Sequence, residues 1–135
     1  MRGIPIHFFA ILGAAIAKMV LGALWYSPAL FVKPWQRMTG ITDEQMKAGM
    51  AKALVVDFIG SLVMAFVLAH IVRYAGATTV LQGLAVGLFC WLGFVAVATI
   101  TTVTYERKPF NLFLLSNGYL LIALLVMGAI LAVWG

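Results

Sequence analysis

The sequence predicts an all-α membrane protein with four transmembrane helices in an antiparallel bundle. Of its 135 residues, 64% are hydrophobic and 10% are charged, and the mean hydropathy is +1.09. A soluble domain carries about 25% charged residues, so this chain lacks the polar side chains that a water-facing surface needs. A bilayer crossing requires roughly 20 mostly apolar residues. Four runs qualify, at residues 4–26, 53–74, 80–103 and 112–134.

These runs fill most of the chain, so we expect one transmembrane domain over residues 1–135 and no soluble catalytic domain. The first span ends in "LWYSPALFVKPW", where Ser27-Pro28 stops the helix because proline disfavours helical geometry in its predecessor. Aromatic rings prefer the headgroup level, and nearby cations attract anionic lipid. The motif therefore predicts interfacial anchors; a binding surface for a partner or lipid is the alternative. The residues are Trp25, Tyr26, Lys33, Trp35 and Arg37.

The second span has a start signal well before its apolar run. Thr42 and Gln45 fit the capping-box pattern, with Asp43 near the positive end of the helix dipole. We expect a helix that begins at about Asp43 and continues into span 53–74. We expect its first turns to project as a cytoplasmic helical extension before the second transmembrane helix, or to bend near Gly49.

Small residues in the spans indicate close helix packing. Gly83 and Gly87 form a GxxxG step in the third span, and Gly128 and Ala132 form a similar step in the fourth. The spacing leaves open whether the contacts lie within one chain or between copies. The glycines predicted to pack are Gly22, Gly83, Gly87 and Gly93.

Three stretches carry a family resemblance: "GALWYSP", then "LFVKPW", then "GLAVGLFCWLGFV". The chain resembles the bacterial membrane family called domain of unknown function 1761, over most of its length. Val32 departs from the pattern, because glycine is expected in the "FGK" form of the motif. The resemblance implies a small multi-pass membrane protein and implies no chemistry.

The distribution of cations predicts the orientation. With four spans, Arg2 and Arg73 share one side with both termini. The other side holds six cations: Lys33, Arg37, Lys47, Lys52, Arg107 and Lys108. Lys and Arg collect on the cytoplasmic side, so we expect both termini outside the cytoplasm of a cell inner membrane.

Two ionisable residues lie deep in the spans. Lys18 precedes Trp25 by seven residues, and Asp57 follows Lys52 by five. At 1.5 Å per residue, both lie roughly 7–10 Å from the cytoplasmic interface. Charges inside a membrane are costly, at about 2.5–3.5 kcal/mol on insertion scales, so they mark candidate functional sites. Because the two spans run antiparallel, we predict a Lys18–Asp57 ion pair.

Other polar residues are expected at the same depth, on all four spans. Ser61 lies one turn after Asp57, while the third and fourth spans add hydroxyl and amide groups. The predicted intramembrane polar cluster is Lys18, Asp57, Ser61, Thr99, Thr102, Ser116, Asn117 and Tyr119. Three readings stay open: structural hydrogen bonding between helices, a solute or proton site, and a lysine that extends to the interface without meeting the aspartate.

Several activities lack support in the sequence. Ser61 and His70 stand nine residues apart on one helix, so they point to opposite sides and cannot form a triad with Asp57. His7 and His70 fit ordinary interface positions, and Cys90 lies too deep to join them at a metal. No phosphate loop, metal-ligand cluster or nucleic-acid-binding pattern is evident. We expect no enzyme activity, no cofactor, no metal and no nucleic-acid partner.

The leading hypothesis is therefore a non-catalytic structural or accessory membrane subunit, held by a buried Lys–Asp cluster. It would form a homo-oligomer or join a larger membrane complex. The first alternative is an oligomeric channel or transporter that passes a proton, ion or small solute along the polar level. The second is a lipid- or pigment-binding accessory protein that uses Trp91 and Tyr119.

Overall fold

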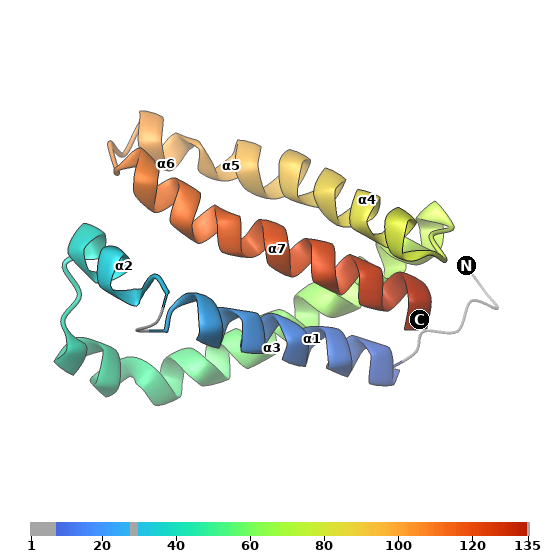
Figure 1. The fold of residues 1–135 in the computed structure, drawn as a ribbon, viewed down its shortest axis with the longest axis horizontal. Coiled ribbons are helices and arrows are strands. Elements are labelled where there is room, and N and C mark those ends of the chain that lie inside the picture. The colour runs from blue at the N-terminus through green and yellow to red at the C-terminus, as the bar shows by residue number, and fades with distance from the viewer. Residues whose placement is uncertain (1–7, 28–29, 135) are drawn as a thin grey trace.

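The computed structural model describes residues 8–27 and 30–134, and this part of the chain is built from helices (Figure 1). Among these residues, four helical stretches are long and apolar enough to cross a membrane. They are α1 (Phe8–Trp25), α3 (Asp43–Ala75), Val80–Thr104 and α7 (Phe110–Trp134). The predicted number of long apolar helices is confirmed.

Large apolar side chains face outward along these helices. Phe9, Phe89 and Phe94 are each more than 70% exposed, at 73%, 71% and 74%. Exposed apolar area of this extent is unusual on a soluble monomer and is the normal surface of a protein in lipid. The outer surface therefore agrees with a membrane protein.

A short helix, α2 (Val32–Thr39), follows α1 and carries three of the predicted interfacial anchors, Lys33, Trp35 and Arg37. Pro34 is the third residue of this helix, where its missing N–H costs no helical hydrogen bond. Gly40 ends the helix in the left-handed conformation, at φ 75°. Val32 is buried, and α2 lies beside the start of α7.

Helix α3 is continuous from Asp43 to Ala75. The predicted capping box is present: Gln45 N–H donates to Thr42 Oγ1 at 3.2 Å, and Thr42 N–H donates to Gln45 Oε1 at 2.9 Å. Gly76 closes the helix at φ 71°. A second capping box, formed by Thr79 and Gln82, starts the next helix.

The third span keeps its predicted place but is not one regular α-helix. It consists of α4 (Val80–Cys90), the π-helix η1 (Trp91–Ala96), α5 (Val97–Thr99) and α6 (Thr101–Thr104). Thr99 donates its hydroxyl to the Val95 carbonyl at 2.6 Å, inside this irregular part. Side-chain bonds of this kind compete with the regular ladder of backbone hydrogen bonds and bend helices.

Helix α7 lies between the other long helices and contacts α1, α3 and α4 (Figure 1). The core is built from small and medium side chains, including Ala14, Ala65, Met127 and Leu131. Small residues allow the helix backbones to approach closely. The resulting van der Waals contacts stabilise the bundle, because the hydrophobic effect does not drive helices together in lipid.

The glycine contacts lie within the chain. A Cβ on Gly83 would overlap the Gly128 carbonyl oxygen, and a Cβ on Gly87 would overlap that of Leu124. The order of these contacts shows that α4 and α7 run in opposite directions. Gly93 behaves differently: nothing lies within 4 Å of a Cβ built on it, and it is exposed in η1. Gly93 therefore makes no close helix contact within this chain, and a packing role between copies stays a prediction.

Candidate functional site, a polar cluster between three helices

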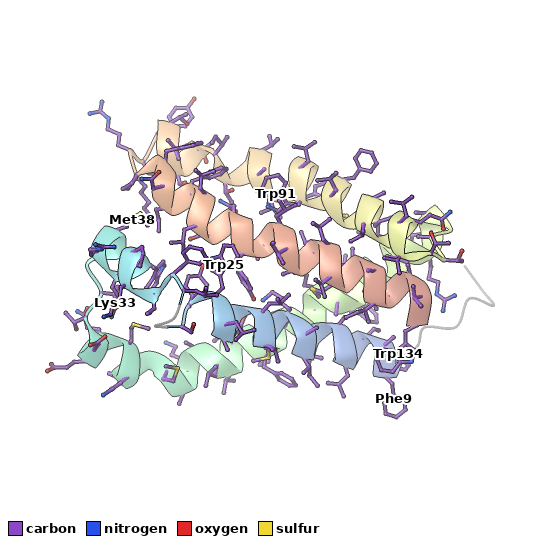
Figure 2. All side chains as sticks on the ribbon, viewed as in Figure 1. Phe9, Trp25, Lys33, Met38, Trp91 and Trp134 are labelled. Atoms are coloured by element: carbon purple, nitrogen blue, oxygen red, sulfur yellow. The ribbon has the colours of Figure 1, made fainter. Side chains whose placement is uncertain are left out.

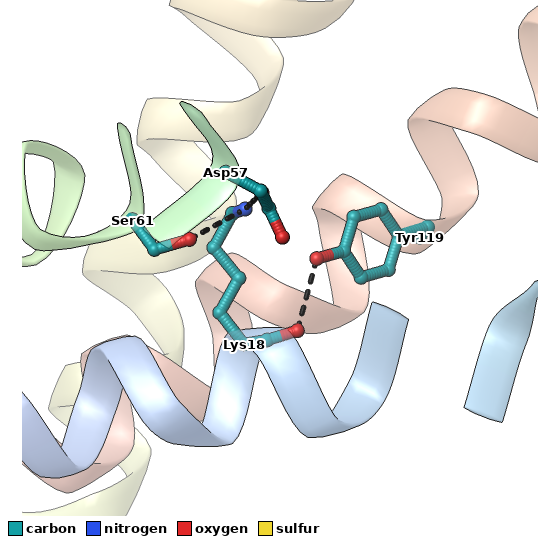
Figure 3. Close-up of polar contacts among 4 residues, drawn as sticks. All are labelled: Lys18, Asp57, Ser61 and Tyr119. Atoms are coloured by element: carbon teal, nitrogen blue, oxygen red, sulfur yellow. Dashed lines mark hydrogen bonds and ion pairs between the residues drawn. The ribbon is translucent and has the colours of Figure 1, made fainter. Parts of the chain in front are cut away.

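The polar cluster begins with Lys18 on α1, which is only 5% exposed. Its ammonium group donates to Asp57 Oδ1 at 3.0 Å and to Ser61 Oγ at 3.0 Å (Figure 3). Asp57 and Ser61 are one turn apart on α3, so a single helix face supplies both acceptors. The ion pair expected between the first two spans is therefore present in the structure.

Helix α7 contributes Tyr119, whose hydroxyl donates to the backbone carbonyl oxygen of Lys18 at 2.9 Å (Figure 3). The Lys18 ammonium also lies 5.6 Å from the centre of the Tyr119 ring, within the range of a cation–π contact. Gly22 makes room for this arrangement, because a Cβ there would stand 2.9 Å from the tyrosine hydroxyl. The cluster thus connects α1, α3 and α7.

The two charges differ in their surroundings. The Lys18 side chain is 7% exposed and that of Asp57 is 44% exposed. The cation is enclosed between helices, while part of the carboxylate reaches the surface of the bundle. The reading in which Lys18 extends to the interface without meeting Asp57 is wrong for this structure, since the side chain ends at the carboxylate and the Ser61 hydroxyl.

The third span does not take part as expected. Thr99 and Thr102 donate their hydroxyls to carbonyls of their own span, at Val95 and Thr99. Helix α4 and its continuation pack on α7, while α1 lies on another side of α7 (Figure 1). Similar depth in the membrane is therefore not enough to bring these threonines to Lys18.

The other predicted members on α7 make different contacts. Asn117 is buried, and its backbone carbonyl accepts a hydrogen bond from Trp91 Nε1 at 2.8 Å. The Ser116 side chain lies close to the Tyr26 hydroxyl. The indole N–H of Trp91, the residue proposed for a lipid or pigment site, thus joins the third span to α7.

The predicted interfacial anchors form an aromatic group at the end of α1. Trp25 Nε1 donates to the Leu115 carbonyl at 2.9 Å. The ring of Tyr26 meets those of Trp35 and Tyr119 edge to face, with centroids 5.8 Å apart in both pairs. These rings pack on the bundle, and the sequence pattern gave no sign of these partners.

The two anchor cations, Lys33 and Arg37, are exposed on α2. Cys90 is partly buried at the end of α4, and His7 falls outside the described residues. His70 Nδ1 lies 2.8 Å from the Phe66 carbonyl oxygen on its own helix. Among the described residues, no three His, Cys, Asp or Glu side chains gather in a way that could hold a metal.

The described residues form an all-helical, multi-pass membrane protein. Its features are four long apolar helices, an outer surface of apolar side chains and an internal ion pair. The family profile described as "Protein of unknown function (DUF1761)" matches residues 9–132. The chain belongs to this family, and the resemblance noted in the sequence is confirmed. No curated protein and no solved structure matched the chain.

Proposed function

We propose that this protein is a non-catalytic structural or accessory subunit of a bacterial inner membrane. Its four helices form an antiparallel bundle in a single domain, and Lys18, Asp57, Ser61 and Tyr119 hold α1, α3 and α7 in register. The subunit works as a homo-oligomer or within a larger membrane complex.

The observation that carries this proposal is the way the cluster's donors are used. The Lys18 ammonium bonds to two side chains of α3, and the Tyr119 hydroxyl bonds to the backbone of α1. Hydrogen bonds between side chains and backbone of different helices stabilise one fixed arrangement of those helices. A transport site instead needs groups that exchange partners with a passing solute, as in proton relays.

One observation favours permeation as a second candidate. The Asp57 side chain is 44% exposed, so part of the carboxylate is accessible from outside the bundle. An accessible carboxylate in a membrane helix can bind a cation or a proton. The two candidates make opposite predictions for flux and for the exchange of the two charges.

The orientation is also part of the proposal. The end of the bundle that holds α2, the start of α3 and the turn before α7 carries Lys33, Arg37, Lys47, Arg107 and Lys108. Arg73 lies at the other end, near the C-terminal end of α7 (Figure 1). The excess of cations supports a cytoplasmic location for the first end, with the first turns of α3 as a cytoplasmic extension.

The test compares single and double charge variants. We expect Asp57→Asn to lower the free energy of unfolding by up to about 3 kcal/mol, because it leaves a buried ammonium without its carboxylate. The loss is limited because the Asp57 side chain is partly exposed to its surroundings. Lys18→Met should cost less, because the remaining carboxylate can turn toward water. The exchange of Lys18→Asp with Asp57→Lys restores an opposite-charge pair and should recover assembly.

The readouts are size-exclusion profiles and thermal unfolding in mild detergent, with Lys33→Met as the control because Lys33 is an exposed cation. A single variant as stable as the wild type would show that the pair does not fix the fold. Purified protein in liposomes separates the two candidates: proton or ion flux that Asp57→Asn abolishes supports permeation and contradicts a purely structural role.

A further inference from the structure

A groove of about 570 Å³ lies where α2 approaches the start of α7, outside the polar cluster. Figure 2 shows Trp25 and Met38 in this region, beside the first turns of α7. Small-molecule sites have volumes of roughly 300–1,000 Å³, so the groove has the size of a ligand site. Its main lining residues are Trp25, Phe31, Arg37, Asn111, Leu114 and Leu115.

The apolar part of the groove has a fixed shape. Trp25 Nε1 donates to the Leu115 carbonyl at 2.9 Å, which joins one wall to the other. The Phe31 ring lies 4.7 Å from the Trp25 ring, centroid to centroid. A wall held by a hydrogen bond and by ring packing is preorganised, so little ordering cost remains for an apolar chain that binds there.

The polar part of the groove carries one charge. Arg37 and Asn111 are both exposed, and among the described residues that line the groove no side chain is acidic. A guanidinium group binds phosphate through two parallel hydrogen bonds, and an amide N–H₂ can donate a further one. The polar part is therefore suited to a phosphate group.

The groove also lies at the right depth for a lipid. Trp25 is the last residue of α1, and tryptophan at the end of a span marks the headgroup level. A ligand with a phosphate at that level and an apolar chain directed along the helices is a phospholipid. The attraction of Arg37 favours a net negative headgroup.

We propose that this groove is a binding site for one anionic phospholipid, with the phosphate on Arg37 and Asn111 and an acyl chain against Trp25, Phe31 and Leu114. The site adjoins the polar cluster, because the Trp25 ring lies 6.5 Å from the Tyr119 ring, but neither Tyr119 nor Trp91 is among its lining residues. Binding at this site depends on one cation of α2, Arg37. General attraction of anionic lipid to the membrane interface would instead depend on every cation at that end of the molecule.

The experiment measures lipid retention by native mass spectrometry. Wild-type protein in mild detergent is titrated with phosphatidylglycerol or with phosphatidylcholine of the same chain length. We expect one phosphatidylglycerol per chain to be retained preferentially. Arg37→Gln should weaken its binding about fivefold or more, which is the effect of one cation at a membrane surface. Lys47→Gln removes a cation at the same end but outside the groove, and should change binding less than about twofold.

A second pair of variants tests the apolar part without changing charge. Leu114→Trp fills the groove and should reduce retention, whereas Leu54→Trp on the exposed face of α3 should not; the two leucines are similarly exposed, at 52% and 51%. Equal retention of the two lipids, equal losses in Arg37→Gln and Lys47→Gln, or full retention in Leu114→Trp would each overturn the proposal. Inorganic phosphate should fail to compete, since it lacks the acyl chain.

Discussion

At the scale of single residues, one lysine organises the contacts between three helices. The Lys18 ammonium donates hydrogen bonds to two side chains of α3, and the Lys18 backbone carbonyl accepts one from Tyr119 of α7. The small neighbours Ala14 and Gly22, one turn before and one turn after it, let the other helices approach. A buried cation is costly, and here its neighbours compensate for that cost with hydrogen bonds and a carboxylate.

The hydroxyl of Tyr119 gives a prediction at this scale. Tyr119→Phe removes the 2.9 Å hydrogen bond to Lys18 and keeps the ring beside the ammonium. We expect a loss of about 1 kcal/mol in the free energy of unfolding, the usual net value of one hydrogen bond. Thermal unfolding in detergent measures it, with Tyr74→Phe as control because Tyr74 is 61% exposed. Equal stability of the two variants would contradict a role for this hydroxyl.

At the scale of elements, the contact between α4 and α7 depends on glycine. Gly83 and Gly128 lie against each other's backbone, so the two helices approach as closely as their main chains permit. The second half of the same span, with its π-helical turn and locally bonded threonines, packs less regularly. The third span is therefore fixed to α7 mainly through its first half.

A pair of alanine variants tests this contact. Gly83→Ala places a methyl group against the Gly128 carbonyl and forces the helices apart. We expect it to destabilise the protein by about 1–3 kcal/mol, the usual cost of overpacking. Gly60→Ala is the matched control on α3, where nothing lies within 4 Å, and should stabilise slightly because alanine favours a helix by up to about 1 kcal/mol. The thermal midpoints should therefore move in opposite directions; a shared direction would contradict the close contact.

At the scale of the whole molecule, charge is concentrated at one end of the bundle. We expect the C-terminal end outside the cytoplasm and the α2–α3 connection inside it, because Lys and Arg are retained on the cytoplasmic side. Alkaline phosphatase fused after Trp134 should be active, whereas the enzyme inserted at Gly40 should be inactive. The reverse pattern would show that the predicted orientation is wrong, and a fluorescent-protein fusion at each position provides the complementary control.

The sequence by itself determined the class of protein, the number of long apolar helices, the family and the capping box at Thr42, and it predicted the pairing of Lys18 with Asp57. These features depend on composition and on spacing along a helix, which a single chain displays directly. Depth along a span can be counted in residues, so two charges at the same depth on neighbouring spans could be matched.

Only the tertiary structure decided which faces of the helices meet. In the structure, the Tyr119 hydroxyl donates to the Lys18 carbonyl. Thr99 and Thr102 bond within their own span, and Gly93 has no neighbour within 4 Å of a Cβ built on it. The tertiary structure also forms the groove between α2 and α7. In a membrane protein, the residues that face lipid are as hydrophobic as the residues that face other helices. The hydrophobic pattern of a span therefore does not indicate which of its faces is buried. Rotation about each helix axis is therefore set by packing between helices, and the sequence pattern carries little information about it.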